Sequence, residues 1–339
     1  MSFFKRLFKS SDNSPAAEQG IALNEATHVS AKDLIGLQQQ ARKLNLCCQS
    51  YASASTTGAH RSRFRGRGMD YQESRIYQAG DDIRNMDWRV TARSGKPHTK
   101  LYQEERERPV VLLVDFSPSM FFGSTNSLKS VVAAKVAAII AWAVAAKGDR
   151  IGALLISDTH RELPPKMGKR GVLQLIRELV NFSDPRKGLR AKVNPNSFNE
   201  ELQRLRHIAR PGSLVFLISD FYNINEETDH YLQRLSQHID IQAIQITDPL
   251  EMTPPPPARY SVTDGEDAGV INTRSKKQRQ RYGDFFNKHQ QQLVKMMRHH
   301  NIPLMQISTA DDVLLTLQKN FSQSGPRNNV AKRNNKRVA

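Results

Sequence analysis

Short apolar runs alternate with amphipathic segments through the middle of the chain. Val110–Val114 is an unbroken β-prone run, which is typical of a strand covered on both faces in a parallel sheet. Similar runs predict further strands at 151–156, 213–219, 241–246 and 303–307. Helical spacing of apolar residues predicts helices at 128–147, 171–182, 199–209, 231–238, 284–300 and 312–320. This alternation predicts an α/β fold, in which helices flank a mostly parallel sheet and the crossovers are right-handed.

The segments outside this pattern are interpreted from their own composition. Apolar positions that recur every three to four residues between Ala31 and Cys48 predict an N-terminal amphipathic helix, and the polar, basic stretch at 50–68 predicts a mobile loop. The turn dipeptide Asp264-Gly265 predicts a small β-hairpin within an insert at about 254–283. We also expect a flexible N-terminus at 1–30 and a disordered basic tail at 321–339.

Composition limits the class of protein. Among 339 residues, 38% hydrophobic content is enough for a sizeable core, and 50 Lys and Arg against 33 Asp and Glu give a formal charge of +17. The two cysteines, Cys47 and Cys48, are too few for a disulfide framework, which fits a reducing cytosol. The apolar run at 131–146 is shorter than the roughly 20 residues of a membrane span, so it predicts a core helix. We expect a cytoplasmic protein without a membrane span, whose basic first residues make at most a weak peripheral contact with a membrane.

Polar side chains come directly after two of the predicted strands, at the point where each strand ends. Asp115, Ser117 and Ser119 come after the first strand, and Asp220 comes after the strand at 213–219. Ligands bind beyond the carboxyl ends of the strands in open parallel sheets, and Mg²⁺ prefers oxygen ligands. The sequence therefore predicts a divalent cation site at this edge, with Mg²⁺ as the expected ion and Mn²⁺ or Ca²⁺ as alternatives.

This pattern resembles the metal-ion-dependent adhesion site (MIDAS) of von Willebrand factor A domains, in which Asp-x-Ser-x-Ser follows the first central strand. The resemblance implies a von Willebrand factor A-like (Rossmann-like) fold and a later aspartate ligand, which Asp220 matches. That family also uses a threonine from a separate loop, for which Ser197 is the nearest substitute. Ser197 and Glu200 also have the spacing of a capping box, so an N-cap role for Ser197 stays open beside metal coordination.

A second resemblance extends from about residue 30 to residue 320. The segment Arg75–Arg93 is similar to the signature of the bacterial DUF58 family, whose members carry a von Willebrand factor A-like domain directly after it. The resemblance implies an N-terminal signature region at 31–108 that packs on a domain at 109–320. Because family members are often encoded beside MoxR-type AAA+ ATPases, it also implies such an ATPase as the partner.

The signature segment mixes acidic and basic side chains in a short space. Opposite charges at this spacing favour a hydrogen-bonded ionic network that holds a loop to the domain, and Gly80-Asp81 predicts a turn. A catalytic pair of carboxylates is the alternative, because adjacent acids shift each other's pKa. The residues concerned are Tyr77, Gly80, Asp81, Asp82, Arg84, Asp87, Trp88 and Arg93.

Motifs of the common enzyme classes are missing from the sequence. It contains no Gly-x-Ser-x-Gly elbow, Walker loop or Gly-x-Gly-x-x-Gly fingerprint, and no His-carboxylate spacing that suggests zinc. A phosphotransferase of the dehalogenase type would need a second acid where Ser117 stands. We therefore expect a non-enzymatic, metal-dependent protein-binding module, in which an acidic side chain of a protein ligand completes the coordination of the ion. Such a module would serve a MoxR-type AAA+ ATPase as an adaptor or a regulator.

Two other functions stay open. Nucleic-acid binding is favoured by basic clusters, whose contact with phosphates would release counterions, although the clusters lie in predicted loops and chain ends and contain few aromatic side chains to stack on bases. The clusters are the tail and Arg61, Arg63, Arg65, Arg67, Arg274, Lys276, Lys277, Arg279 and Arg281. The other function is structural: a metal ion that ties the strand ends together without binding a partner.

Overall fold

The computed structural model describes residues 24–44, 69–104, 109–191, 194, 196–263 and 268–323. Contacts divide the chain into two compact units, a larger one of residues 1–49 and 108–339 and a smaller one of residues 50–107. Some predicted features fall outside the described residues: most of the N-terminus, both cysteines, the basic loop at 50–68, the Asp264-Gly265 turn and the tail beyond Gln323.

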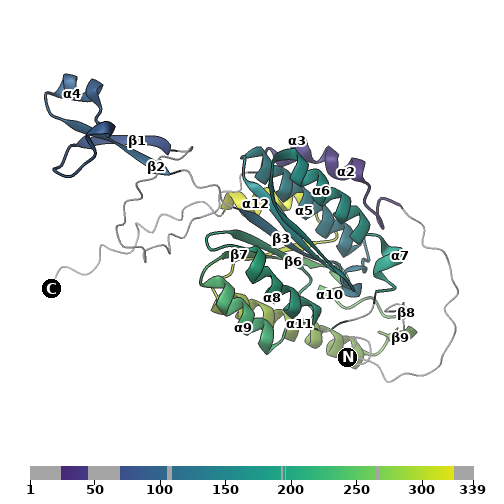
Figure 1. Ribbon diagram of the computed structural model, residues 1–339. Coiled ribbons are helices and arrows are strands. Elements are labelled where there is room, and N and C mark those ends of the chain that lie inside the picture. The colour runs from purple at the N-terminus through teal and green to yellow at the C-terminus, as the bar shows by residue number, and fades with distance from the viewer. Residues whose placement is uncertain are drawn as a thin grey trace, which may run out of the picture. The chain divides into compact units, whose positions relative to one another are not determined.

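A six-stranded sheet forms the centre of the larger unit, with the strand order β10-β7-β6-β3-β4-β5 (Figure 1). All neighbouring strands are parallel except β4 and β5, which pair antiparallel. The strands are β3 (Val110–Asp115), β4 (Arg150–Ile156), β5 (His160–Met167), β6 (Leu214–Ser219), β7 (Asp240–Thr247) and β10 (Leu304–Ser308). The prediction of a mostly parallel sheet with strands at these five positions is confirmed, and four of the five, β3, β4, β6 and β7, are mostly buried.

Strand β5 is the strand of this sheet that apolar patterning does not predict. It lies at an edge, and most of its side chains are exposed or half-buried, so it lacks the apolar run that marks the other strands. Pro164 and Pro165 lie within it. Proline is tolerated at an edge because its missing N–H does not interrupt the pairing of a central strand.

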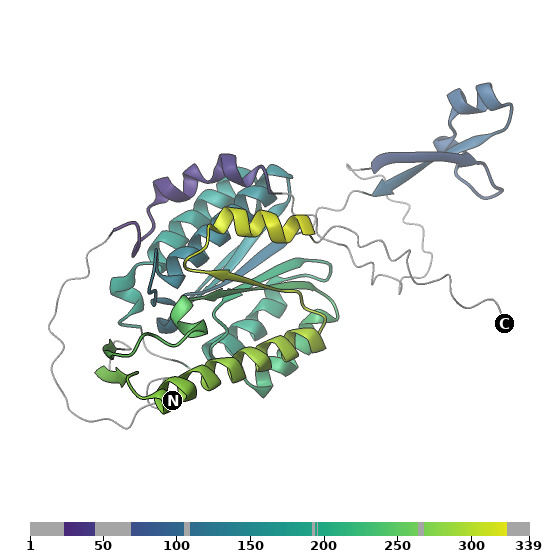
Figure 2. The same ribbon diagram turned by 180° about the vertical axis from the view of Figure 1, so that it is seen from behind.

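Helices cover both faces of the sheet (Figure 1 and Figure 2). Because successive side chains of a strand point to opposite faces, Leu112 of β3 packs in one core and Leu113 in the other. The first core is covered by α5 (Lys129–Ala146), α6 (Gly168–Phe182) and α12 (Val313–Gln323). The second is covered by α8 (Ser197–Ile208), α9 (Glu226–Ser236) and α11 (Lys276–His299). Short turns of helix are η2 (Pro118–Met120), α7 (Pro185–Gly188) and α10 (Pro249–Met252).

Helix α5 is the central helix of the first core. Among the described residues it is the one helix that is long and apolar enough to cross a membrane, but 83% of it is buried inside the domain. Gly148 follows the helix with a φ of +85°, a left-handed conformation that costs glycine little and lets the chain leave the helix. The prediction of a core helix at this position is confirmed.

The predicted N-terminal helix consists of two short helices, α2 (Ala31–Gly36) and α3 (Gln38–Ala41). Ser30 and Asp33 form a capping box at the start of α2, and the indole N–H of Trp142 donates a hydrogen bond to the carbonyl of Leu34 at 3.0 Å. The sequence-based domain boundary at 31–108 grouped this segment with the signature region. In the structure it belongs to the larger unit, because its apolar side chains pack in the core around α5.

The insert after α10 contains the predicted hairpin, formed by β8 (Arg259–Thr263) and β9 (Ala268–Asn272). Helix α11 begins at Lys276 rather than near residue 284. Its first two turns are mostly polar, so the apolar period that predicts a helix starts late. The basic cluster that was predicted to lie in a loop is therefore partly helical.

The smaller unit is an antiparallel ribbon of β1 (Met69–Ile76) and β2 (His98–Glu104). The turn η1 (Ile83–Asn85) and the helix α4 (Trp88–Ser94) connect the two strands. Apolar patterning predicts neither strand, because both mix polar and apolar residues without a continuous apolar run. The signature segment thus runs from the end of β1 through α4.

Candidate functional site

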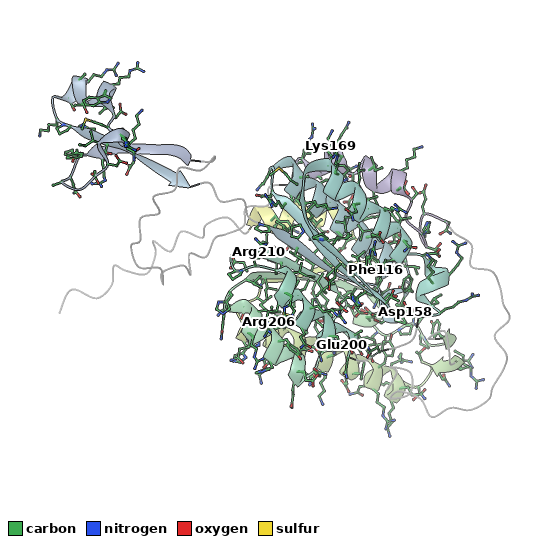
Figure 3. All side chains as sticks on the ribbon, in the orientation of Figure 1. Phe116, Asp158, Lys169, Glu200, Arg206 and Arg210 are labelled. Carbon is green, nitrogen blue, oxygen red and sulfur yellow. The ribbon has the colours of Figure 1, made fainter. Side chains whose placement is uncertain are left out.

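The carboxyl ends of the parallel strands meet at one edge of the sheet. Figure 3 labels Phe116 and Asp158, which follow β3 and β4 at this edge, and Arg210, which precedes β6 at the opposite edge. Since β3 and β6 are neighbours and Val114 pairs with Ile218, the loops after these two strands begin side by side. The sheet topology therefore brings together ligands that are about 100 residues apart in sequence.

Asp115, Ser117 and Ser119 form a hydrogen-bonded cluster at this edge, as their motif predicted. One carboxylate oxygen of Asp115 accepts the backbone N–H of Ser117 at 2.8 Å, and the other accepts the hydroxyl of Ser219 at 2.6 Å. The hydroxyl oxygens of Ser117 and Ser119 are 3.1 Å apart. A carboxylate and two hydroxyls thus share one small volume at the end of β3.

Asp220 adjoins this cluster and is bound by a lysine. The Nζ atom of Lys129 lies 2.9 Å from Oδ2 of Asp220 and 2.6 Å from Oε1 of Glu251. The backbone N–H of Tyr222 donates to Oδ1 of Asp220 at 3.0 Å, and the nearby side chain of Ser119 acts to lower the pKa of this carboxylate. Lys129 begins helix α5 and is only 1% exposed. An aspartate that was predicted as a metal ligand is therefore paired with a buried ammonium.

The chain turns sharply directly after Asp220. Phe221 has a φ of +55°, a left-handed conformation that costs a residue with a Cβ atom about 1 kcal/mol or more. Its buried ring packs edge-on against Phe198, and its N–H donates to the hydroxyl of Ser219 at 2.9 Å. Packing of the ring therefore holds a strained turn that aims Asp220 at the end of β3.

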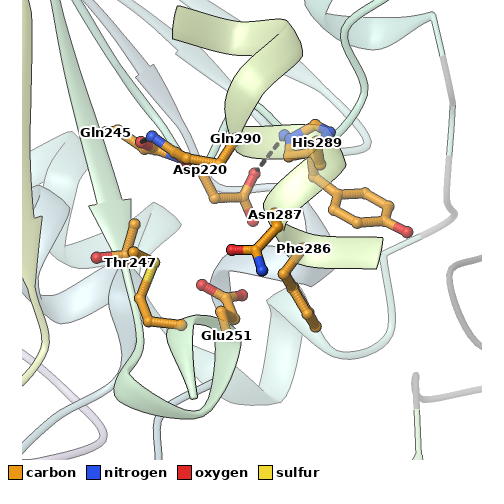
Figure 4. A pocket seen from close by; sticks show the side chains of 10 residues that line it. Asp220, Gln245, Thr247, Glu251, Phe286, Asn287, His289 and Gln290 are labelled. Atoms are coloured by element: carbon orange, nitrogen blue, oxygen red, sulfur yellow. Dashed lines mark hydrogen bonds between the residues drawn. The ribbon is translucent and has the colours of Figure 1, made fainter. Parts of the chain in front are cut away.

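A pocket opens beside Asp220 (Figure 4). Asp115 and Asp220 are buried, with exposed fractions of 6% and 7%. The pocket lies between the ends of β6 and β7, helix α10 and the middle of α11, and its lining includes Asp220, Gln245, Thr247, Glu251, Phe286 and His289. Of the residues at this edge that the sequence singled out, Asp220 therefore lines the pocket.

The charges of the cluster interact through a poorly solvated environment. Burial and the negative charge of Asp220 raise the pKa of Asp115 to about 6. Burial also acts to raise the pKa of Asp220, but the charge and hydrogen bond of Lys129 outweigh it and lower that pKa. Burial acts to lower the pKa of Lys129, while Asp220 and Glu251 raise it above its ordinary value. The lysine is therefore charged at neutral pH, and Asp115 carries a charge with no cation of its own among the described residues.

Asp248 is a third buried carboxylate at this edge, beside Asp115 and Asp220, and binds three segments together. It accepts the N–H and the hydroxyl of Ser124 at 2.8 and 2.5 Å, the hydroxyl of Thr309 at 2.7 Å and the N–H of Leu250 at 3.0 Å. Burial acts to raise its pKa, but these hydrogen bonds lower it. Asp248 also caps the helix that carries Glu251, so it fixes one partner of Lys129.

Ser197 does not join this cluster. It is the first residue of α8, and its N–H donates to the carbonyl of Asn194 at 3.2 Å. Among the described residues, no hydrogen bond connects Ser197 with Asp115 or Asp220. The capping box predicted from Ser197 and Glu200 is wrong as well, because Asn196 occupies the N-cap position and forms no side-chain cap.

Among the described residues, the fold brings together a group of two histidines and a carboxylate that spacing in the sequence did not reveal. Potential ligand atoms of Asp229, His299 and His300 lie within 4.8 Å of one another. Nε2 of His300 is 2.7 Å from a carboxylate oxygen of Asp229. The group joins the start of α9 to the end of α11, two helices that are distant in sequence. The direct histidine–aspartate bond makes it a contact between helices.

Sequence reasoning missed Lys129, Asp248 and Glu251. Asp115 and Asp220 were found because each lies directly after an apolar run, and the same criterion finds Asp248 when it is applied to β7. No such signal exists for Lys129, because a lysine at the start of an apolar helix is usually exposed. No sequence signal identifies Glu251 either, because its role depends on where α10 places it.

The signature segment forms local contacts within the smaller unit. Arg75 pairs with Asp81 at 2.7 Å, and Gly80 has a φ of +108° in the predicted turn. Asp82 accepts the N–H of Arg84 and so caps η1. Asp87 caps α4 and also accepts the hydroxyl of Ser74, and these hydrogen bonds lower its pKa. Asp82 and Asp87 therefore serve as helix caps, and Asp81 pairs with Arg75.

Trp88 begins α4 and has an exposed fraction of 67%. Replacing it with alanine is expected to change the free energy of unfolding by no more than about 0.5 kcal/mol, since an exposed ring loses little packing. The matched control is Trp142→Phe, which removes a buried indole hydrogen bond and is expected to cost about 1–2 kcal/mol. Denaturant titration monitored by circular dichroism measures both. A loss above about 2 kcal/mol for Trp88→Ala would show that the indole packs against protein.

The geometry defines the class of protein. A doubly wound, mostly parallel sheet with one antiparallel edge strand, and an Asp-x-Ser-x-Ser loop at its carboxyl edge beside a second aspartate, make the larger unit a von Willebrand factor A-like domain. The chain belongs to the DUF58 family, described as "Protein of unknown function DUF58", whose model matches residues 73–292. The match includes both the signature segment and the sheet edge with its cluster.

Relatives and solved structures have similarly general descriptions. Proteins of Mycobacterium bovis and Mycobacterium tuberculosis, both described as uncharacterized, are 28% identical over 277 residues, which is 80% of this chain and 85% of each relative. The conserved hypothetical protein BatB from Bacteroides thetaiotaomicron aligns with 64% of this chain and 98% of its own, at 10% identity and a TM-score of 0.40. A von Willebrand factor type A structure from Catenulispora acidiphila aligns with 67% of this chain and 43% of its own, at 13% identity and a TM-score of 0.32.

Proposed function

We propose that this protein is a non-enzymatic protein-binding module, which binds an acidic side chain of a partner at the carboxyl edge of its sheet. The observation that best supports the proposal is the convergence of Asp115, Ser117, Ser119 and Asp220 beside a pocket. This edge is where ligands bind in open parallel sheets. The two serines offer neutral hydroxyls, so a cation held there keeps positive charge for an incoming carboxylate.

The donor set fits Mg²⁺, with Mn²⁺ and Ca²⁺ as alternatives. All donors are hard oxygens, and the raised pKa of Asp115 indicates a carboxylate that lacks a compensating charge. Asp115, Ser117 and Ser119 would hold the ion directly or through water, and Asp220 would hold a coordinated water. When bound, the ion would supply the positive charge and the open coordination position that the partner's carboxylate fills.

The proposed partner is a MoxR-type AAA+ ATPase in the cytoplasm, to which the protein would recruit substrates or which it would regulate. The support for this partner is membership of the DUF58 family and the gene association that the family resemblance implies. The low cysteine content supports a reducing compartment. The family description itself names no partner or activity.

Replacing Asp115 with alanine is expected to reduce capture of a purified MoxR-type ATPase at least tenfold in the presence of Mg²⁺. Chelation should reduce capture by the unchanged protein to a similar degree, because both treatments remove the cation. Binding is measured by pull-down or biolayer interferometry. Asp158→Ala is the matched control, because Asp158 follows the neighbouring strand β4 but has no hydrogen bond to the cluster among the described residues. Capture that is unchanged in Asp115→Ala, in Mg²⁺ and in chelator, would refute the proposal.

Nucleic-acid binding is the second candidate function, favoured by the exposed basic side chains around the start of α11. These side chains are Arg274, Lys276, Lys277 and Arg281. Binding through them should weaken steeply with salt, because each phosphate contact releases counterions. Titration of labelled duplex and single-stranded DNA at two salt concentrations tests this function. Absence of binding at the lower salt concentration would exclude it.

A further inference from the structure

Lys129 is unusual in its position and its surroundings. It lies in the first turn of the buried helix α5, where its side chain is almost completely excluded from solvent. A buried ammonium is costly unless carboxylates pair with it. Lys129 has two such partners, Asp220 at 2.9 Å and Glu251 at 2.6 Å. The two carboxylates therefore compensate the cost of burying this ammonium.

The ammonium of Lys129 and a divalent ion would compete for the same carboxylate, that of Asp220. Oδ2 of Asp220 accepts from Lys129, while Oδ1 accepts the N–H of Tyr222. A metal ion that recruits Asp220 would lie close to the ammonium, and two like charges in a poorly solvated site repel strongly. Asp115, Ser117 and Ser119 have no such competitor among the described residues.

We infer that Lys129 is an internal cation that competes with the divalent ion for Asp220 and thereby weakens metal binding at this site. This inference rests on the proposed metal site and adds the residue that sets its affinity. With Lys129 in place, an ion held through Asp115, Ser117 and Ser119 gains Asp220 only by displacing the ammonium that lies 2.9 Å from its carboxylate. Without the ammonium, Asp220 becomes available and the local charge becomes more negative by one unit.

Glu251 gives the competition a structural consequence. It lies on α10, which Asp248 caps, and it lines the same pocket as Asp220. When an ion draws Asp220 away, Lys129 retains Glu251 as its partner. The lysine can therefore yield one carboxylate without being left buried and unpaired. Occupancy of the metal site is coupled through Lys129 to the wall of the pocket.

The test is the affinity of the full chain for Mg²⁺ alone, measured by isothermal titration calorimetry. Lys129→Met keeps the length of the side chain and removes its charge, and it is expected to bind Mg²⁺ at least tenfold more tightly than the unchanged protein. Lys129→Arg keeps the charge and should retain the weaker affinity. Lys135→Met is the matched control on the same helix and should also leave the affinity unchanged. Equal or weaker Mg²⁺ binding by Lys129→Met would overturn the inference.

A double variant keeps the inference testable if Lys129→Met does not fold. Lys129→Met/Glu251→Gln removes one carboxylate together with the lysine, so that Asp220 is left without its cation and without the neighbouring acid. Its melting temperature should rise with added MgCl₂ by more than that of the unchanged protein, because a ligand that binds the folded state stabilises it. Equal shifts would contradict the inference. Partner capture is measured separately. Equal Mg²⁺ affinity of Lys129→Met and the unchanged protein, together with loss of capture in Asp115→Ala, would overturn the role of Lys129 while leaving the proposed function intact.

Discussion

Replacing Lys129 with methionine is expected to lower the free energy of unfolding by about 3–5 kcal/mol in the presence of a chelator. The substitution leaves Asp220 and Glu251 buried at the same place without the ammonium that lies 2.9 and 2.6 Å from them. Removing one partner of a buried ion pair is costly because the remaining charge keeps its desolvation penalty. Urea or guanidinium unfolding monitored by circular dichroism measures the loss.

Two comparisons separate this charge effect from a packing effect. Lys135→Met, at a half-buried position of the same helix, is expected to change stability by less than about 1 kcal/mol. Lys129→Met/Glu251→Gln should regain part of the loss, because one of the two unpaired carboxylates becomes a neutral amide. If Lys129→Met costs less than about 1 kcal/mol, the three side chains do not form a stabilising ion network.

Replacing Asp115 with asparagine is expected to stabilise the domain at neutral pH by about 1–3 kcal/mol while abolishing metal-dependent partner capture. Burial and Asp220 raise the pKa of this carboxylate from an ordinary value of 3.8 to about 6, and each unit corresponds to about 1.4 kcal/mol. Both existing hydrogen bonds tolerate the amide: its oxygen accepts from Ser117 N–H, and its NH₂ faces the hydroxyl of Ser219, which can accept.

The pH dependence gives this prediction a definite sign. Because the pKa in the folded state is above that in the unfolded state, the folded state binds a proton more readily between pH 3.8 and about 6. The stability contributed by protonated Asp115 is complete below pH 3.8 and is lost as the pH rises through about 6. The advantage of Asp115→Asn in chelator should therefore be largest above about pH 7 and shrink toward about pH 5. An advantage that does not change between about pH 8 and pH 5 would contradict the assigned cause.

The sheet and most of its helices could be predicted from apolar patterns, since burial on both faces leaves continuous runs such as Val110–Val114. The pattern fails where burial is incomplete. Strand β5 lies at an edge, the ribbon of β1 and β2 has no continuous apolar run, and the first turns of α11 are polar. These three elements are positioned by their partners in the fold, so their sequences lack the apolar period that predicts a strand or a helix.

The candidate site divides in the same way. Sequence patterning places Asp115, Ser117 and Ser119 directly after one buried strand and Asp220 directly after another, because each follows a continuous apolar run. The contacts of Lys129 with Asp220 and Glu251 depend on the fold, and so does the place of Ser197, which begins α8 and has no hydrogen bond to Asp115 or Asp220 among the described residues. Residues that meet through a turn can be identified from their spacing. A lysine and a glutamate 122 positions apart meet only because the fold buries one charge and must place the opposite charge beside it.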